Sequence, residues 1–302
     1  MNIRRTLRRF FGRSASGELS TYRMLPPALK PDRFCHPVTG YEDTTLEAHV
    51  NRRSFVTQAA ASLGVASQLG LPLPLTKAVG QAPSASSNRR LRVVVAGGHP
   101  GDPEYGCGGT IARLTALGHE VVLLYLNDNE WGGVTAATRT SEARKACEIL
   151  KARPVWAGQK TTYAIVDSAH YKQWAKLLDA ENPDAVFTQW PIDNHIDHRA
   201  TAILTYGAWI DSKKKFCLYY YEVTNGGDTL QFSPTHYVNI TETEPQKRAA
   251  CYAHAHASPD GFYKIQDQVA DFRGIESGNK KAEAFIYQVQ SPHDPLKELG
   301  LA

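Results

Sequence analysis

The sequence lacks several patterns that would assign it to a common class of protein at once. Its five cysteines are scattered and form no C-x-x-C pair, which excludes zinc-ribbon and thioredoxin-type motifs. No G-x-G-x-x-G and no internal repeat is found, so nothing indicates a dinucleotide. No apolar run is long and unbroken enough to predict a transmembrane span. The composition, 42% hydrophobic and 21% charged, is that of a soluble globular protein.

Charge is distributed unevenly along the chain. The net charge is +4, but residues 1–90 hold 13 Lys+Arg against 5 Asp+Glu, and the remainder holds 21 against 25. The body of the protein is therefore mildly acidic, and the overall basic charge is no evidence for nucleic-acid binding. We expect no nucleic-acid partner and interpret the arginine-rich start as an unstructured tail rather than a basic arm.

A segment that resembles an export signal lies at residues 50–85. Arg52 and Arg53 precede a moderately apolar run without acidic residues, as in a twin-arginine (Tat) signal peptide. The alternatives are an amphipathic helix of the fold and a membrane anchor. We expect export by the Tat route to the periplasm or the cell exterior, with no stable membrane span after signal removal. Without a functional signal the protein would be cytoplasmic.

Residues 1–49 precede this signal, although signal peptides normally stand near the N-terminus. We interpret them as a disordered extension or as sequence upstream of the true start, with translation beginning at Val50 from a GTG codon. N-terminal sequencing of the unprocessed protein tests the second interpretation, which a peptide from residues 1–49 would contradict. The folded domain is expected at residues 91–290, followed by a tail at 291–302.

Strands and helices alternate from residue 91 onward. Strands are expected at 91–98, 120–127, 154–157, 184–190, 216–223, 236–241 and 284–289, and helices at 108–117, 139–150, 169–180, 198–210 and 244–256. Repeated β–α units predict an α/β fold of three layers, a doubly wound and mostly parallel sheet with helices on both faces. Binding sites in such sheets form beyond the carboxyl ends of the strands, where the strand order reverses.

Metal-type side chains follow the first and the fourth of these strands. They are His99, Asp102 and Glu104 after the first, and Asp193, His195, Asp197 and His198 after the fourth. Because these strands are neighbours at the reversal point, we expect both clusters to face one crevice. Two histidines and a carboxylate leave coordination positions open, as catalytic zinc requires, and the same set suits the Fe(II) of an oxygenase. Each cluster alone also fits a charged loop, with Asp197 as N-cap of the next helix.

Several segments resemble the signatures of the PIG-L/LmbE-like deacetylases. H-P-G-D-P-E-Y-G-C-G-G-T-I-A is similar to the family's "HPDD-x-E-x-G-x-GG", and D-N-H-I-D-H-R-A to its "D-x-HPDHRA". Two further patterns, one around Arg139 between these segments and a later one in K-R-A-A-C-Y-A-H, extend the resemblance over roughly residues 91–290. The resemblance implies a Rossmann-like fold and a zinc-dependent enzyme that removes the acetyl group from N-acetylated amino sugars and related amides, with a small-molecule or glycan substrate.

The resemblance also implies roles for individual residues. The zinc ligands by position are His99, Asp102 and His198. His195 would polarise the scissile carbonyl or protonate the leaving amine, and Asp197 would orient an imidazole. Arg139 would hold the substrate, and Asp193 would support the loop or the water. The sequence does not give the oligomeric state.

The chain departs from the family at a position that bears directly on the reaction. The first Asp of "HPDD" is the family's general base, and here that position is Gly101. A general base typically contributes about 10²–10⁴-fold to the rate. We expect Glu104 or Asp193 to replace it. The alternatives are an unaided zinc-bound hydroxide, or a non-hydrolytic metal-containing carbohydrate-binding protein. His256, where the family tends to have Ser-Gln, is interpreted as a surface histidine.

Overall fold

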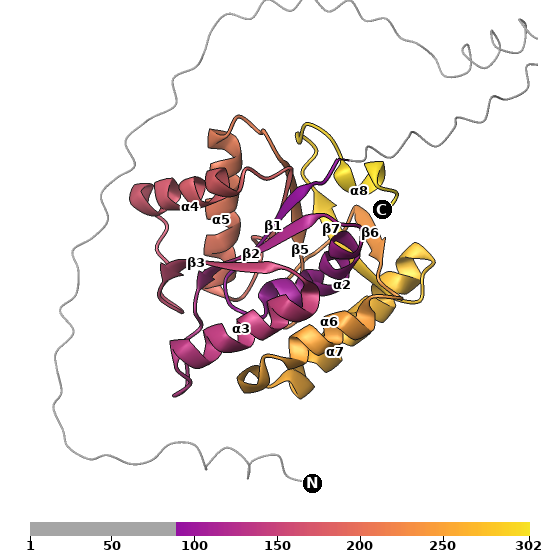
Figure 1. The fold of residues 1–302 in the computed structure, drawn as a ribbon, viewed down its shortest axis with the longest axis horizontal. Helices are drawn as coiled ribbons and strands as arrows, with labels where there is room; N and C mark the ends of the chain where they lie inside the picture. Colours follow the sequence, from indigo (N-terminus) through magenta and orange to yellow (C-terminus); the bar gives the residue numbers. More distant parts are fainter. Residues whose placement is uncertain (1–88) are drawn as a thin grey trace, which may run out of the picture. The chain divides into compact units, whose positions relative to one another are not determined.

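The computed structural model describes residues 89–302, so the expected extension at 1–49 and the expected signal at 50–85 lie outside the described residues. The strands are β1 (Arg92–Gly97), β2 (Glu120–Asn127), β3 (Arg153–Gln159), β4 (Ala185–Gln189), β5 (Cys217–Tyr221), β6 (His236–Asn239) and β7 (Ala282–Tyr287) (Figure 1). The helices are α2 (Asp102–Ala116), α3 (Ala136–Leu150), α4 (Ser168–Glu181), α5 (Ile196–Asp211), α6 (Glu244–Tyr252), α7 (Pro259–Ser277) and α8 (Pro295–Glu298), with a 3₁₀ turn, η2, at Ala255–Ala257.

All seven strands belong to one sheet, in the order β3-β2-β1-β4-β5-β7-β6. The five strands from β3 to β5 are parallel, and β7 pairs antiparallel with both β5 and β6. The strand order reverses at β1, which pairs with β2 on one side and with β4 on the other. The prediction of a doubly wound, mostly parallel sheet is confirmed, and β1 and β4 are neighbours.

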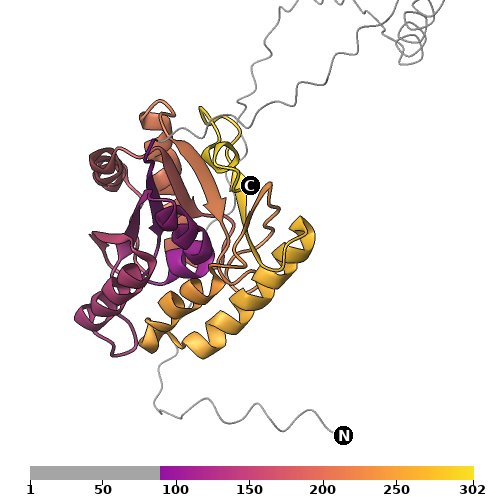
Figure 2. The same cartoon turned by 45° about the vertical axis from the view of Figure 1, so that its right-hand side comes forward.

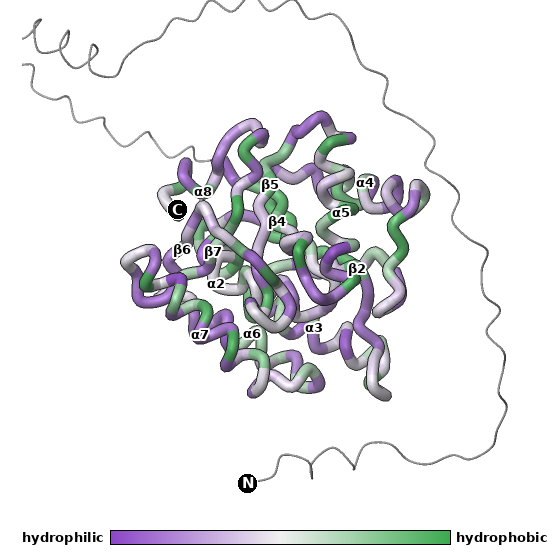
Figure 3. Tube along the Cα trace, turned by 180° about the vertical axis from the view of Figure 1, so that it is seen from behind, coloured by the Kyte–Doolittle hydropathy of each residue, from purple (hydrophilic) through white to green (hydrophobic). Residues whose placement is uncertain are grey.

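Helices cover both faces of the sheet, so the prediction of three layers is also confirmed. Val93 and Val95 point to the face covered by α2, α3, α6 and α7, whereas Val94 and Ala96 point to the face covered by α4 and α5. Successive side chains of a strand point to opposite faces, so a strand buried on both faces is apolar throughout. Figure 2 shows α6 and α7 side by side on their face. In Figure 3, hydrophobic colour follows β2, whereas α7 alternates between hydrophobic and hydrophilic residues.

Helix α2 begins at Asp102, six residues earlier than the sequence pattern predicted. Its first turn contains Pro103 and the acidic Glu104, both favourable there, but its centre is rich in glycine, which disfavours helix. These glycines permit close packing: a Cβ at Gly106 would lie 2.3 Å from the Cδ2 of Tyr221. Asp102 and Glu104, which the sequence pattern placed in a loop, thus belong to the first turn of α2.

Two features of the C-terminal part were not predicted from the sequence. Helix α7 was not expected, because its apolar residues Phe262 and Ile275 are exposed while the polar Gln266 and Arg273 face the core. Residues 291–302 were expected to form a tail, yet they contain α8, and Leu296 is buried in the main core.

The described part of the chain shows two further features of its residues. Its four cysteines, Cys107, Cys147, Cys217 and Cys251, are buried and free. None of the helices at residues 89–302 combines the length and the apolar character needed to cross a membrane.

Candidate functional site

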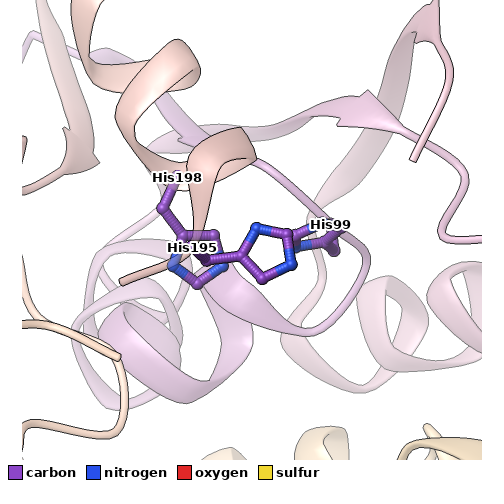
Figure 4. Close-up of side chains that lie close together, drawn as sticks. All are labelled: His99, His195 and His198. Carbon is purple, nitrogen blue, oxygen red and sulfur yellow. The ribbon is translucent and has the colours of Figure 1, made fainter. Parts of the chain in front are cut away.

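Three histidines from the two strand ends converge beyond the carboxyl edge of the sheet. His99 follows β1, and His195 and His198 stand at the start of α5, directly after β4 (Figure 4). The ring centroids of His99 and His195 are 4.5 Å apart, and those of His195 and His198 are 4.7 Å apart. One nitrogen of each ring lies within 4.8 Å of the others, close enough to hold one metal ion. Adjacent parallel strands bring both clusters to one crevice, as the sequence predicted.

Asp102 places a carboxylate oxygen between two of these rings. Its Oδ2 lies 3.1 Å from Nδ1 of His99 and 3.2 Å from Nε2 of His198. The same oxygen accepts hydrogen bonds from the backbone N–H of His99, at 2.8 Å, and from Nε2 of Gln189, at 3.0 Å. The oxygen and the two imidazole nitrogens form a compact set of donors that suits a first-row divalent cation.

The electrostatics of this group favour positive charge. Burial alone lowers the pKa of His198, but the adjacent Asp102 carboxylate raises that pKa to about 10. Burial likewise opposes ionisation of Asp102, yet His198 and His99 hold the pKa of its carboxyl well below the ordinary range. A divalent cation would supply the positive charge that protonation of the histidines supplies in the metal-free site.

His99 and His198 each have a second ring nitrogen, on the side away from Asp102, and a buried carboxylate faces each of these outer nitrogens. Nε2 of His99 lies 3.1 Å from Oδ2 of Asp197, and Nδ1 of His198 lies 3.1 Å from Oδ1 of Asp193. Each carboxylate accepts an N–H, so the other ring nitrogen of a neutral imidazole keeps its lone pair. In the metal-free site each inner nitrogen lies against Oδ2 of Asp102, with a proton between the two atoms, and a bound cation would take the place of that proton. Outer carboxylates commonly orient metal-binding histidines in this way.

His195 differs from His99 and His198, because its ring accepts a hydrogen bond from a backbone N–H instead of facing a carboxylate. It is the N-cap of α5, the position expected for Asp197, and its Nδ1 accepts the backbone N–H of Asp197 at 3.2 Å. A neutral imidazole that accepts at Nδ1 carries its proton on Nε2. Burial, together with the nearby His99 and His198, lowers the pKa of His195 and so favours this neutral form. His195 therefore offers an N–H donor, whereas His99 and His198 would offer lone pairs to a cation that displaces their inner protons.

Polar residues at two strand ends support the site and were not predicted from the sequence. Nδ2 of Asn127, the last residue of β2, donates to Oδ2 of Asp197 at 3.0 Å, and the backbone N–H of Thr162 donates to the same oxygen at 2.6 Å. Gln189, the last residue of β4, accepts the backbone N–H of Gly98 at 2.8 Å and holds Asp102. The sequence feature that could have indicated Asn127 and Gln189 is an amide side chain at the carboxyl end of a buried apolar strand.

Glu104 is not placed to replace the missing base, which corrects that prediction. Its Oε1 accepts from the Tyr125 hydroxyl at 2.7 Å and lies 2.9 Å from Nε2 of His254. Its Oε2 accepts the backbone N–H of Gly101 at 3.1 Å, which closes the first turn of α2. The side chain is fully buried and does not line the cavity at the site. Glu104 instead joins α2 to β2 and to the segment after α6.

Asp193 is likewise occupied, which corrects its prediction as an alternative base. Its Oδ1 accepts from the backbone N–H of His195 at 2.8 Å as well as from His198, and its Oδ2 accepts from the Thr229 hydroxyl at 2.9 Å. It is buried and does not line the cavity. These contacts make Asp193 a support of the histidine loop.

A cavity of about 410 Å³ opens in front of the histidines, and Arg139 and His256 line its other side. Nη2 of Arg139 donates to the backbone oxygen of Pro100 at 3.1 Å, and Nη1 donates to Glu142 at 2.7 Å. Glu142 in turn lies 2.6 Å from Nδ1 of His256, whose side chain is 55% exposed. His256 is thus exposed, as expected, but it belongs to the wall of the cavity.

Gly101 lines the same cavity and has φ +114°, in the region that favours glycine. A Cβ at this position would meet nothing closer than the Tyr105 ring at 3.6 Å, an ordinary contact. The backbone conformation, rather than crowding, therefore selects glycine here.

Comparison with known proteins finds a family model and curated relatives that are named as deacetylases. Residues 93–209 match the family model of PIG-L, GlcNAc-PI de-N-acetylase. The uncharacterized deacetylase YaiS of Escherichia coli is 32% identical over 76 residues, which are 25% of this chain and 41% of that protein, so the match spans less than half of the relative. The diacetylchitobiose deacetylase of Thermococcus kodakarensis is 24% identical over 213 residues, 63% of this chain and 80% of that protein.

A solved structure has the same fold. The N,N'-diacetylchitobiose deacetylase from Pyrococcus horikoshii superposes with a TM-score of 0.59 at 24% identity, over 68% of this chain and 88% of that chain. The resemblance inferred from the sequence motifs is confirmed by these comparisons.

Proposed function

We propose, from the premise that residues 93–209 form a PIG-L family domain, that this protein is a zinc-dependent hydrolase that removes the acyl group from N-acyl amino sugars or related glycoconjugates. One observation carries the proposal: an inner ring nitrogen of His99 and one of His198 both lie within 3.2 Å of the Asp102 carboxylate, while buried carboxylates lie against their outer nitrogens. The deacetylase names of the matched proteins support the reaction class.

The donor set supports zinc, with Fe²⁺ as the alternative cation. Two neutral imidazole nitrogens and one carboxylate oxygen are three protein ligands, the number that leaves a position open for water and substrate. When bound, zinc supplies a Lewis acid that polarises the amide carbonyl and lowers the pKa of a water towards ~7. Fe(II) also takes two histidines and one carboxylate, so metal analysis of the purified protein distinguishes the two.

Two residues of the chain would assist the hydrolysis, one directly and one indirectly. Water oxygen bonds to the carbonyl carbon, the C–N bond breaks, the amine nitrogen gains a proton and the acid is released. Nε2–H of His195 would donate to the carbonyl oxygen as negative charge develops there, the kind of donor that electrostatic catalysis uses. Arg139 would act indirectly, because its guanidinium fixes the Pro100 carbonyl beside the metal loop.

The proton of the attacking water needs an acceptor other than Glu104 and Asp193. Among the described residues that line the cavity, and apart from Tyr105, whose pKa burial raises, the ionisable acceptors outside the histidine–Asp102 cluster are Asp228 and His256. Asp228→Asn and His256→Gln should be measured separately. Loss of the true acceptor should lower kcat by about 10²–10⁴-fold. Full activity in both variants would leave the metal-activated water to react without a side-chain base.

The proposal is tested on the purified full chain. Zinc should co-purify, and the protein should release acetate from N-acetylated amino sugars in a reaction that a chelator stops and zinc restores. Gly101 favours a second function, metal-containing carbohydrate binding without hydrolysis. Sugar binding without acetate release from a broad panel of substrates would establish that second function and contradict the first.

Tat export also belongs to the proposal, and it rests on the sequence of residues 50–85 alone. Replacing Arg52 and Arg53 with lysine should block export of a reporter fused to this segment. Export of the doubly substituted fusion would contradict the assignment.

A further inference from the structure

Two aromatic side chains stand at the mouth of the cavity, on walls that come from distant parts of the chain. Trp131 lies in the loop between β2 and α3, and Phe262 lies in the first turns of α7; we call this pair the aromatic rim. Trp131 is 70% exposed and Phe262 45% exposed, yet both line the cavity that His99 and His198 line. Single exposed apolar residues are common, but two large rings on one concave site mark a ligand surface.

A tight turn fixes the backbone that carries Trp131. The backbone N–H of Val134 donates to the oxygen of Trp131 at 3.0 Å, and the two residues form an isolated antiparallel bridge. Between them, Gly132 and Gly133 have φ of +61° and +84°, as the two central residues of a type I′ turn require. The turn fixes the backbone of a residue that is 70% exposed, so its ring contributes little to the packing of the protein.

The opposite wall is tied to the helix that follows this turn. Oε1 of Glu142, on α3, lies 2.6 Å from Nδ1 of His256 and accepts the backbone N–H of His256 at 3.0 Å. His256 belongs to η2, which leads directly into α7 and Phe262. These contacts join the two walls. The Nδ1 atom of His256 faces Glu142, and its side chain, which is 55% exposed, lines the cavity.

We infer that the aromatic rim is a subsite for a second sugar ring, adjacent to the ring whose amide is cleaved. The inference rests on the proposed function and specifies its substrate class: an oligosaccharide or glycoconjugate with at least two sugars. A pyranose has an apolar face of C–H groups and a polar edge of hydroxyls. Trp131 and Phe262 provide surfaces for such a face, and the exposed edge of His256 provides a hydrogen-bonding group for the hydroxyls.

The polarity of the mouth favours a sugar over a long acyl chain. Besides Trp131 and Phe262, the cavity is lined by Asn129, His256 and Asp228, all of which carry hydrogen-bonding groups. An alkyl chain bound there would strip water from these groups without replacing its hydrogen bonds, which is unfavourable. A sugar ring meets both requirements, because it stacks through one face and hydrogen-bonds through its edge.

The test uses Trp131→Ala and Phe262→Ala in the full chain, each with a matched exposed control. Tyr163→Ala and Phe272→Ala remove rings that are 77% and 53% exposed and do not line the cavity. KM and kcat are measured on N-acetylglucosamine and on N,N'-diacetylchitobiose. Trp131→Ala should raise KM for the disaccharide by about threefold to tenfold, the range expected for one aromatic contact, and should leave the monosaccharide unchanged. Phe262→Ala should act in the same direction, and the controls should match the wild type.

Some kinetic outcomes would overturn the inference. Equal KM changes on both sugars, or no change on either, would show that the rim does not contact a second ring. A change that appears only when the acetyl group of the monosaccharide is replaced by a longer acyl chain would assign the rim to the acyl group instead.

A binding measurement tests the subsite independently of the hydrolase activity. Calorimetry with chitotriose needs no hydrolysis. If the wild type releases no acetate but binds chitotriose, and Trp131→Ala weakens that binding threefold or more, the subsite stands while the hydrolase proposal fails. If hydrolysis is observed and chitotriose binding is the same in wild type and Trp131→Ala, the subsite fails while the hydrolase proposal stands.

Discussion

The inner and outer walls of the cavity are built on different principles. On the inner wall, the ring nitrogens of His99 and His198 each face a carboxylate, and Asn127 and Gln189 hold the carboxylates in turn. On the outer wall, the side chains of Trp131 and Phe262 are exposed to solvent. The inner wall is therefore organised without a ligand, as electrostatic catalysis requires, whereas under the subsite inference the outer wall would gain its contacts only with substrate.

The largest effect should come from removing the central oxygen of the inner wall. Asp102→Ala leaves the lone pairs of His99 and His198 without the anionic ligand between them. We expect loss of the bound metal and of activity, beyond the roughly 10–100-fold that loss of a supporting carboxylate costs. Metal per chain after dialysis, measured by mass spectrometry, is the readout, with circular dichroism to show that the chain is folded. A fully loaded Asp102→Ala protein would contradict the ligand set.

His195 separates the roles of the three histidines. Because its proton is on Nε2, we expect His195→Asn to keep the metal and to lower kcat by about 10²–10³-fold, as removal of one oxyanion donor does. Asparagine retains a side-chain oxygen for the N-cap of α5, and His195→Ala serves as the comparison without a cap. If both variants lose the metal, the three histidines together are the ligands and the tautomer assignment is wrong.

A smaller effect is expected from the carboxylates behind the histidines. Asp197→Asn and Asp193→Asn each replace an acceptor that fixes a tautomer, and each should weaken metal binding by about 10–100-fold. Competition with a chromogenic chelator measures the affinity. Asp211→Asn, at the exposed C-terminal end of the same helix as Asp197, is the control and should bind as the wild type does. Wild-type affinity in both test variants would show that the outer carboxylates are dispensable.

The smallest effect concerns the backbone at Gly101. Gly101→Ala places a side chain at φ +114°, which should lower the free energy of unfolding by about 1–3 kcal/mol. Gly261→Ala is the control, since its Cβ would meet no atom within 4 Å and its φ is not positive. Urea denaturation measures both variants.

Gly101→Asp carries the same strain and tests the missing base. We expect no gain in acetate release, since the nearest group to a Cβ at this position is the Tyr105 ring. A large gain would show that the wild type had lost a base that the site can still accommodate.

The sequence predicted the frame of the molecule well and its finer assignments less well. Buried β-branched runs such as Val93–Val95 mark strands wherever they occur, so the sheet and the meeting of His99 with His198 followed from strand order. Helix α7 could not be found in the same way, because it exposes Phe262 and buries Arg273 beside Glu222. That inversion depends on a partner more than fifty residues away in the chain.

The reassignment of Glu104 and Asp193 has the same origin. Both are acidic residues within a metal-type motif, and a motif records residue types and spacing, but not direction. Their carboxylates turn away from the cavity because buried donors, among them the Tyr125 hydroxyl and the Thr229 hydroxyl, must be satisfied. Those donors come from other strands and loops, and no spacing within the motif indicates them.

The sequence by itself determined that two strand ends carry histidines and carboxylates, and that a glycine stands where the family has its base. The order of strands in a parallel sheet is enough to bring such residues to one edge. Only the tertiary structure decided which groups face each ring nitrogen of His99, His195 and His198, because those carboxylates and backbone groups come from separate elements. The tertiary structure also placed Trp131 and Phe262 around one cavity, since the chain brings those two residues together only after the sheet and its helices have formed.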